Sequence, residues 1–162
     1  MAFSKAAMEH IRANNVQDVL WIAYWKSYLD ENPADYQAAF RRTLDELLAA
    51  GCRVWLLKET PHFPWDAPKA AAKAAHQGQP VEQVSIPAQS YRDYLATPER
   101  GFEWAAERGT KLLEFTPWLE QNGTIPVFRN GGVLFLDETH LSRHGALIIQ
   151  PVFEPLFSKN IP

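Results

Sequence analysis

Apolar residues along the chain follow two alternating periods, one typical of strands and one typical of helices. Residues 18–25 are a continuous apolar run rich in Val, Ile and aromatic residues, which predicts a strand buried on both faces, and residues 52–59, "CRVWLLKE", predict the next strand. Between them lies a segment whose apolar residues recur at helical spacing. These residues are Tyr36, Phe40, Leu44, Leu47 and Leu48. Asn32 is a typical helix cap, Pro33 suits the first helical position, and Gly51 favours the left-handed conformation that ends a helix. The three elements therefore form a strand–helix–strand unit.

Further helices are predicted on either side of this unit. Residues 3–12 are mildly amphipathic and predict a short helix. An Ala-rich stretch after a proline-punctuated loop predicts a helix that ends at Gly78. Residues 89–108 predict a longer helix, which Pro98 kinks or divides. The intervening "VEQVSIPA", residues 81–88, is predicted to be a loop.

The C-terminal third combines strand and turn signals with one more helix. "TKLLEF", residues 110–115, predicts a third strand. The pair Asn130 and Gly131 between apolar runs predicts a hairpin turn, and Ser142 is a typical cap for a helix that ends the chain. This alternation of strands and helices predicts an α/β fold of three layers with a mainly parallel sheet.

Composition and charge narrow the class of protein. Hydrophobic residues make up 46% of the 162-residue chain, which is typical of one packed domain over residues 1–162. The formal net charge of −3 gives no reason to expect nucleic-acid binding. The one cysteine, Cys52, excludes an internal disulfide and any multi-cysteine metal site. No apolar run approaches the ~18–20 residues of a membrane-spanning helix, and the N-terminus lacks the apolar centre of a signal peptide.

Asp137 and His140 form the candidate catalytic pair. Asp137 follows the apolar run 133–136, which predicts that it lies at the carboxyl end of a strand, where α/β sheets gather catalytic groups. A carboxylate three residues before a histidine can accept a hydrogen bond from the imidazole Nδ1–H, which leaves Nε2 free to deprotonate a nucleophile. The spacing alone also fits a polar surface turn in which Asp137 and Ser142 are caps, and this alternative stays open.

The longer string "LDETHLSRHGA", residues 136–146, resembles the last catalytic block of SGNH-type esterases and acyltransferases. Its form D-x-x-H-L-S-x-x-G-A is most similar to the SGNH domain appended to membrane O-acyltransferases that modify bacterial surface polysaccharides. "VLWIAYWKSYL", residues 19–29, resembles that family's third strand and Trp-containing turn, and residues 47–68 resemble its next helix, strand and loop. The resemblance covers nearly the whole chain and implies an SGNH-like, flavodoxin-like sandwich.

The resemblance also implies roles for individual residues. It makes His140 the general base and Asp137 the carboxylate that orients it, while Trp25 and Ser27 line the rim of the substrate site. The implied function is an O-acyl (acetyl) transferase or esterase with Ser-His-Asp chemistry, an acyl donor, a carbohydrate acceptor and no cofactor. The implied partners are a membrane acyltransferase domain, or a chain that carries the missing N-terminal part. The implied location is periplasmic or otherwise extracytoplasmic.

The departure from the family pattern concerns the nucleophile. SGNH domains open with a Gly-Asp-Ser block, and none of the eight glycines here precedes Asp-Ser. We therefore expect residues 1–162 to be the C-terminal two-thirds of such a domain, without its first strand. Such a chain is expected to be inactive alone, because acyl transfer needs a nucleophile beside the base. The alternative is a catalytically inactive module of the same fold that binds carbohydrate or a partner.

Two other histidines bear on the site. His62 lies in the loop "TPHFPWD", which leaves the carboxyl end of a predicted strand. It fits either a residue that packs beside aromatic rings or one that lines a substrate groove. His144 lies four residues after His140, a spacing shared by metal-ligand pairs on helices. No metal site is expected, because no Glu follows His140 and His140 precedes the predicted helix.

Overall fold

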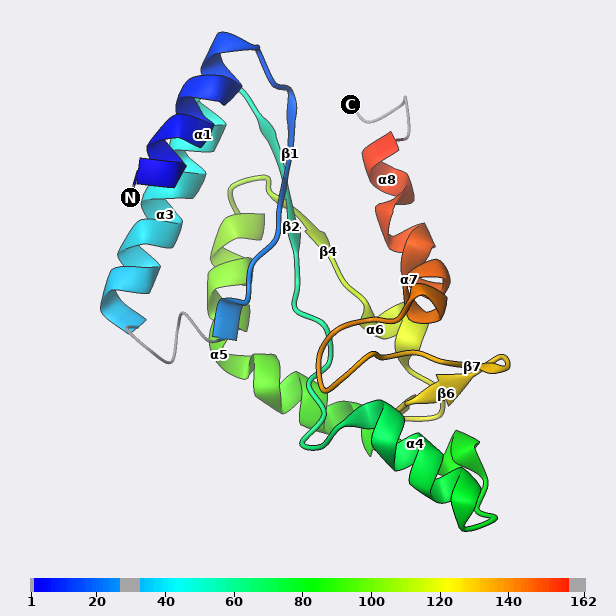
Figure 1. Cartoon of the computed structure of the whole chain (residues 1–162). Coiled ribbons are helices and arrows are strands. Elements are labelled where there is room, and N and C mark those ends of the chain that lie inside the picture. Colours follow the sequence, from blue (N-terminus) through cyan, green and yellow to red (C-terminus); the bar gives the residue numbers. More distant parts are fainter. Residues whose placement is uncertain (1, 27–32, 158–162) are drawn as a thin grey trace. The chain divides into compact units, whose positions relative to one another are not determined.

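The computed structural model describes residues 2–26 and 33–157, which divide into two compact units. The first unit contains the chain up to residue 58 together with residues 97–113, and the second contains residues 59–96 together with the chain from residue 114 (Figure 1). No helix in the described ranges has the length and apolar character needed to cross a bilayer. The prediction that residues 1–162 form a single domain stays a prediction.

The first unit is built on a parallel three-stranded sheet in the order β1-β2-β4. Its elements are α1 (Ala2–Ala13), β1 (Asp18–Trp21), α3 (Pro33–Ala49), β2 (Arg53–Leu57), the second half of α5 (Ala88–Ala106) and β4 (Lys111–Leu113). The predicted strand–helix–strand unit and the third strand are therefore confirmed. Gly51 has the left-handed backbone expected after α3, with φ +80°.

The prediction for the first strand is wrong in its length and burial. β1 ends at Trp21 rather than at residue 25, and its four residues are only half-buried. The physical reason is its place in the sheet. Among the described strands, β1 is hydrogen-bonded on one side only, by β2, so it is an edge strand rather than a central one. The central strand β2 is the one whose Val54, Trp55, Leu56 and Leu57 are all buried.

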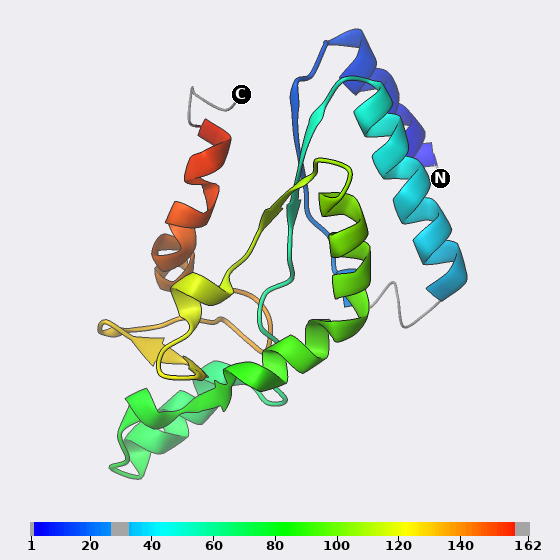
Figure 2. The same ribbon diagram turned by 180° about the vertical axis from the view of Figure 1, so that it is seen from behind.

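Helices pack on one side of β2 to form the core of the first unit. Val54 and Leu56 point to the same face, because alternate residues of a strand share a face. They pack in one cluster with Met8 of α1, Leu44 of α3 and Phe102 of α5. α1 and α3 lie side by side in both views (Figure 1, Figure 2). This burial provides most of the stabilisation of the unit.

The second unit is a collection of short elements. They are α4 (Ala67–His76), the 3-10 helix η1 (Val81–Gln83), β3 (Ser85–Pro87), the first half of α5, α6 (Thr116–Leu119), β5 (Thr124–Pro126), β6 (Phe128–Arg129), β7 (Gly132–Val133), α7 (Arg143–Ile149), the 3-10 helix η2 (Gln150–Phe153) and α8 (Glu154–Phe157). The hairpin prediction is confirmed, since β6 and β7 pair antiparallel around Asn130 and Gly131, which have φ 51° and 82°. The predicted loop 81–88 instead contains β3, which pairs with β5.

The apolar run 133–136 does not end a strand of the parallel sheet, which corrects the sequence prediction. Only Gly132–Val133 is strand, and it belongs to the β6–β7 hairpin. Beyond it, the backbone N–H of Leu134 donates to the carbonyl of Val127, and that of Leu136 donates to the carbonyl of His140. The chain therefore turns back on itself, with Phe135 bridged to Leu141. The apolar side chains of Leu134 and Phe135 are buried, although both residues lie beyond the end of the strand.

α7 packs directly on this turning segment. The Ser142 side chain accepts a hydrogen bond from the backbone N–H of Gly145, which confirms the predicted helix cap. A Cβ added at Gly145 would lie 2.1 Å from the carbonyl oxygen of Leu134. Only glycine allows the helix to approach this backbone so closely.

We expect Gly145→Ala to destabilise the protein by about 2–3 kcal/mol, because its methyl group collides with backbone that cannot give way. The matched control is Gly101→Ala in α5, where the added Cβ meets only the Phe40 ring at 3.8 Å. That change should leave stability unaltered or raise it by up to ~1 kcal/mol through helix propensity. Urea unfolding of both variants measures the difference, and equal effects would contradict the close packing of α7.

Candidate active site

Asp137 organises the turn that carries His140. Its Oδ1 accepts hydrogen bonds from the backbone N–H of Thr139 and of His140, each at 2.8 Å. Its Oδ2 lies 2.8 Å from Nδ1 of the His140 imidazole. One carboxylate therefore fixes both the backbone of the turn and the side chain of the histidine. The sequence spacing predicted this pairing of carboxylate and imidazole.

The hydrogen bonds keep Asp137 ionised. The backbone N–H of His140, the backbone N–H of Thr139 and the His140 imidazole hold the pKa of this carboxyl far below its usual range. An ionised carboxylate can only accept, so the imidazole must carry its proton on Nδ1. The lone pair of the neutral ring then lies on Nε2, the nitrogen that is available to accept a proton.

The His140 ring projects into solvent, with 76% of its side chain exposed. In the part of the chain that the structure describes, Nε2 makes no hydrogen bond, whereas Nδ1 is held by Asp137 and lies 3.3 Å from the Thr139 hydroxyl. The histidine is thus oriented from one side and open on the other. This arrangement can take a proton from a hydroxyl group that approaches Nε2.

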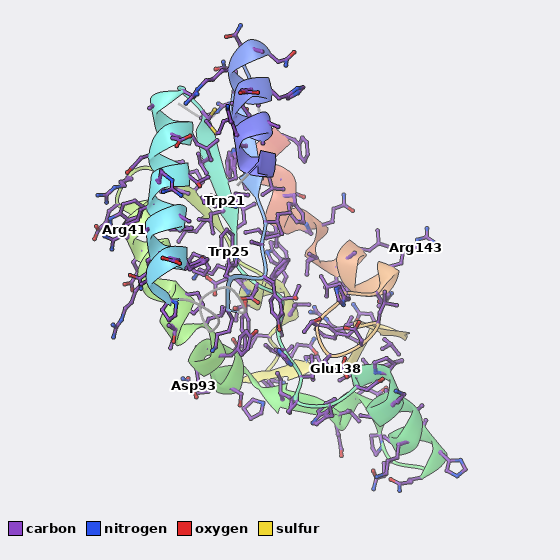
Figure 3. The ribbon with its side chains drawn as sticks, turned by 60° about the vertical axis from the view of Figure 1, so that its left-hand side comes forward. Trp21, Trp25, Arg41, Asp93, Glu138 and Arg143 are labelled. Atoms are coloured by element: carbon purple, nitrogen blue, oxygen red, sulfur yellow. The ribbon has the colours of Figure 1, made fainter. Side chains whose placement is uncertain are left out.

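A second segment of the chain braces the turn. The Thr60 hydroxyl donates to the carbonyl of Thr139 at 2.7 Å, and the backbone N–H of Phe63 donates to the carbonyl of Glu138 at 2.9 Å. The Phe63 ring is fully buried and packs edge-on against Phe135, with centroids 4.7 Å apart. Glu138 lies in the turn before α7 (Figure 3). The loop 60–63 therefore supports the backbone that presents His140.

Sequence reasoning missed Thr60 and Phe63. Thr60 and Thr139 are 79 positions apart in the chain. No sequence motif relates a loop threonine to a carbonyl so far away along the chain. Every residue has a backbone carbonyl, so a hydrogen bond from a hydroxyl to such a group does not require a particular residue type at the acceptor position. The only available signal was the resemblance of residues 47–68 to a family loop.

His144 has a structural role beside the site. Its Nε2 lies 2.8 Å from the carbonyl oxygen of Arg129, and its ring covers Gly132, where an added Cβ would lie 2.6 Å from the ring. The residue thereby ties α7 to the β6–β7 hairpin. The Ser142 hydroxyl also donates to the carbonyl of Val133, so helix and hairpin are joined at two points.

The other predicted site residues lie elsewhere. Trp25 belongs to the first unit, where its side chain is 1% exposed and its N–H donates to the carbonyl of Leu57 at 2.7 Å. Its ring packs edge-on against the rings of Phe40 and Phe102 as a core residue. Ser27 lies outside the described residues. His62 is half-buried in the second unit, and its ring lies 5.3 Å from that of Tyr94. Substrate contact by these three residues stays a prediction.

The lowered pKa of Asp137 predicts a contribution to acid stability. Because its pKa is lower in the folded than in the unfolded chain, the contribution is present above the unfolded value of about 3.9 and is lost as pH falls through the folded value. Urea unfolding between about pH 5 and about pH 2 should therefore show a smaller loss of stability for Asp137→Asn than for the wild type. Asp45→Asn, which removes the same charge at an exposed site of α3, should follow the wild type. Parallel curves for all three proteins would contradict the role of Asp137.

The brace from Thr60 can be tested separately. Thr60→Val removes the donor to the Thr139 carbonyl and should lower the free energy of unfolding by about 1 kcal/mol. Thr60→Ser keeps the hydroxyl and should recover most of that loss. Urea unfolding distinguishes the two variants. If they are equally destabilised, the hydrogen bond contributes nothing and the methyl packing of Thr60 is what matters.

Comparisons with known proteins place this geometry in a family. The structure resembles the periplasmic domain of a lipopolysaccharide acetyltransferase from Salmonella ser. Paratyphi A, with a TM-score of 0.64, 12% sequence identity, and coverage of 94% of this chain and 61% of that chain. At this identity the likeness shows the fold, and the chain spans about three-fifths of that neighbour. No curated protein matches the sequence significantly.

The family model described as "SGNH domain (fused to AT3 domains)" matches residues 1–155. These findings confirm the α/β, SGNH-like fold and the predicted resemblance: the chain belongs to the family of SGNH domains fused to AT3 acyltransferase domains.

Proposed function

We propose that this chain supplies the base and its orienting carboxylate to an O-acyl transfer site that modifies a cell-surface carbohydrate outside the cytoplasm. Asp137 holds His140, and His140 moves the proton. The working partner is a membrane acyltransferase domain of the AT3 type, consistent with the fusion that defines the family. The acyl group is an acetyl group, in keeping with the activity named for the structural neighbour.

The single observation that carries this proposal is the 2.8 Å contact between Asp137 Oδ2 and His140 Nδ1. It joins an ionised carboxylate to an imidazole whose Nε2 is open to solvent. A surface turn needs only the two backbone hydrogen bonds that Asp137 Oδ1 accepts. The second oxygen is used for the imidazole, as in a Ser-His-Asp triad.

The nucleophile in this proposal is a serine from a Gly-Asp-Ser segment that is not among residues 1–162. His140 Nε2 takes the serine proton while the serine oxygen bonds to the acyl carbon of the donor ester. The ester C–O bond breaks, and the leaving oxygen receives that proton. A sugar hydroxyl then attacks the acyl-serine, gives its proton to His140, and forms the new ester as the serine oxygen leaves and is reprotonated.

A non-catalytic binding module of the same fold is the second candidate. The observation that favours it is the absence of Gly-Asp-Ser from the sequence. The nearest serine in sequence, Ser142, has its hydroxyl engaged by the carbonyl of Val133 and the N–H of Gly145. It is therefore not placed to act as the missing nucleophile.

The test compares ester hydrolysis by residues 1–162 with hydrolysis by the same chain extended upstream to a Gly-Asp-Ser segment. With p-nitrophenyl acetate as the substrate, we expect turnover only in the extended protein. There, His140→Ala and Asp137→Asn should each lower kcat on the order of 10³–10⁴-fold, as in serine hydrolases that lose a triad member.

The matched control is His76→Ala, an exposed histidine at the end of α4, which should keep full activity. A gene that encodes no Gly-Asp-Ser ahead of Met1 would contradict the proposal and favour the binding module. The same conclusion follows if hydrolysis by the extended protein is insensitive to His140→Ala.

A further inference from the structure

A hollow of about 210 Å³ lies between α3 and the second half of α5, entirely within the first unit. Its apolar wall consists of the aromatic residues Tyr36, Phe40 and Trp104 together with Pro98. Two arginines, Arg41 from α3 and Arg100 from α5, line the same hollow. Neither Asp137 nor His140 contributes to it, since both belong to the second unit.

The charge of this hollow is unbalanced. In the structure's described ranges its lining contains two arginines and no acidic side chain. Within those same ranges, neither Arg41 nor Arg100 forms an ion pair, whereas Arg53, Lys58 and Arg92 each have a carboxylate partner. Two guanidinium groups that have no carboxylate partner among the described residues, in a protein of net charge −3, favour an anionic ligand at this place.

The arginine on α3 is held in position by the aromatic wall. The guanidinium carbon of Arg41 lies 5.1 Å from the centre of the Trp104 ring, within the range of a cation–π contact. Arg108 lies over the same ring at 3.8 Å and donates to the Trp104 carbonyl, which fixes the indole in turn. Arg41 lies on the outer side of α3 (Figure 3). Arg41 is itself exposed to solvent, and the contact with Trp104 keeps its guanidinium group beside the wall of the hollow.

We propose that this hollow binds a single sugar residue that carries a carboxylate group. The carboxylate accepts hydrogen bonds from Arg41 and Arg100, which match its geometry. The apolar face of the sugar ring packs on the aromatic wall. The volume lies below the ~300–1,000 Å³ of pockets for drug-sized ligands and suits one ring. This inference does not rest on the proposed function, because the hollow contains neither member of the catalytic pair.

Titration with D-glucuronate, followed by NMR shifts of the amides of Thr97, Gly101 and Trp104, tests the proposal on residues 1–162. We expect saturable binding of glucuronate, with D-glucose and inorganic phosphate at least about ten-fold weaker at the same ionic strength. If glucose binds equally well, the proposed role of the arginines is wrong. If inorganic phosphate binds equally well, the hollow is a general anion site and the proposed sugar ligand is wrong. An absence of saturable shifts also overturns the proposal.

Charge-matched variants locate the binding. Arg41→Gln and Arg100→Gln should each weaken glucuronate binding by about ten-fold, because each removes a charge-assisted hydrogen bond. Arg42→Gln removes the same charge from the next position of α3, which does not line the hollow, and should change the affinity less than two-fold. If Arg42→Gln weakens binding as much as Arg41→Gln, the attraction is diffuse and the proposed site is wrong. Unchanged urea unfolding of the three variants shows that none of these effects comes from loss of the fold.

Discussion

The carboxylate of Asp137 is the interaction on which the second unit's site depends. It ties together two backbone N–H groups and one imidazole, so backbone shape and side-chain direction are set by the same charge. Because those donors also lower its pKa, the group stays an acceptor at every pH where the protein is expected to work. The turn, the tautomer of His140 and the exposure of Nε2 all follow from this one ion.

Close packing around the turn makes this arrangement rigid. Gly145 lets α7 touch the backbone at Leu134, His144 anchors the hairpin, and the loop 60–63 supplies two hydrogen bonds from a distant part of the chain. The histidine itself is exposed, yet the backbone that carries it is supported from several directions. Catalytic groups are commonly held in this way, on a short loop supported by firm surroundings.

The sequence alone predicted the features that depend on residues close together in the chain. It missed those that depend on contacts between residues far apart in the chain. The ends of α3 followed from Pro33 and Gly51, and the Asp137–His140 contact followed from a three-residue spacing. β3 was missed because Ile86 becomes strand only by pairing with Ile125. The apolar run 133–136 was assigned to a strand because Leu134 and Phe135 are apolar and buried. The same run of apolar residues is expected whether their backbone groups bond within a sheet or, as here, within a local turn.

The two units are interleaved along the chain, which passes from one to the other after residues 58, 96 and 113. α5 itself is shared, and the change of unit falls between Ala96 and Thr97, just before the helix-interior Pro98. Neither unit is therefore a continuous segment of polypeptide. A single proteolytic cut or a simple terminal deletion cannot release one unit intact. Neither the first nor the second unit can therefore be expressed alone as one continuous segment of the gene.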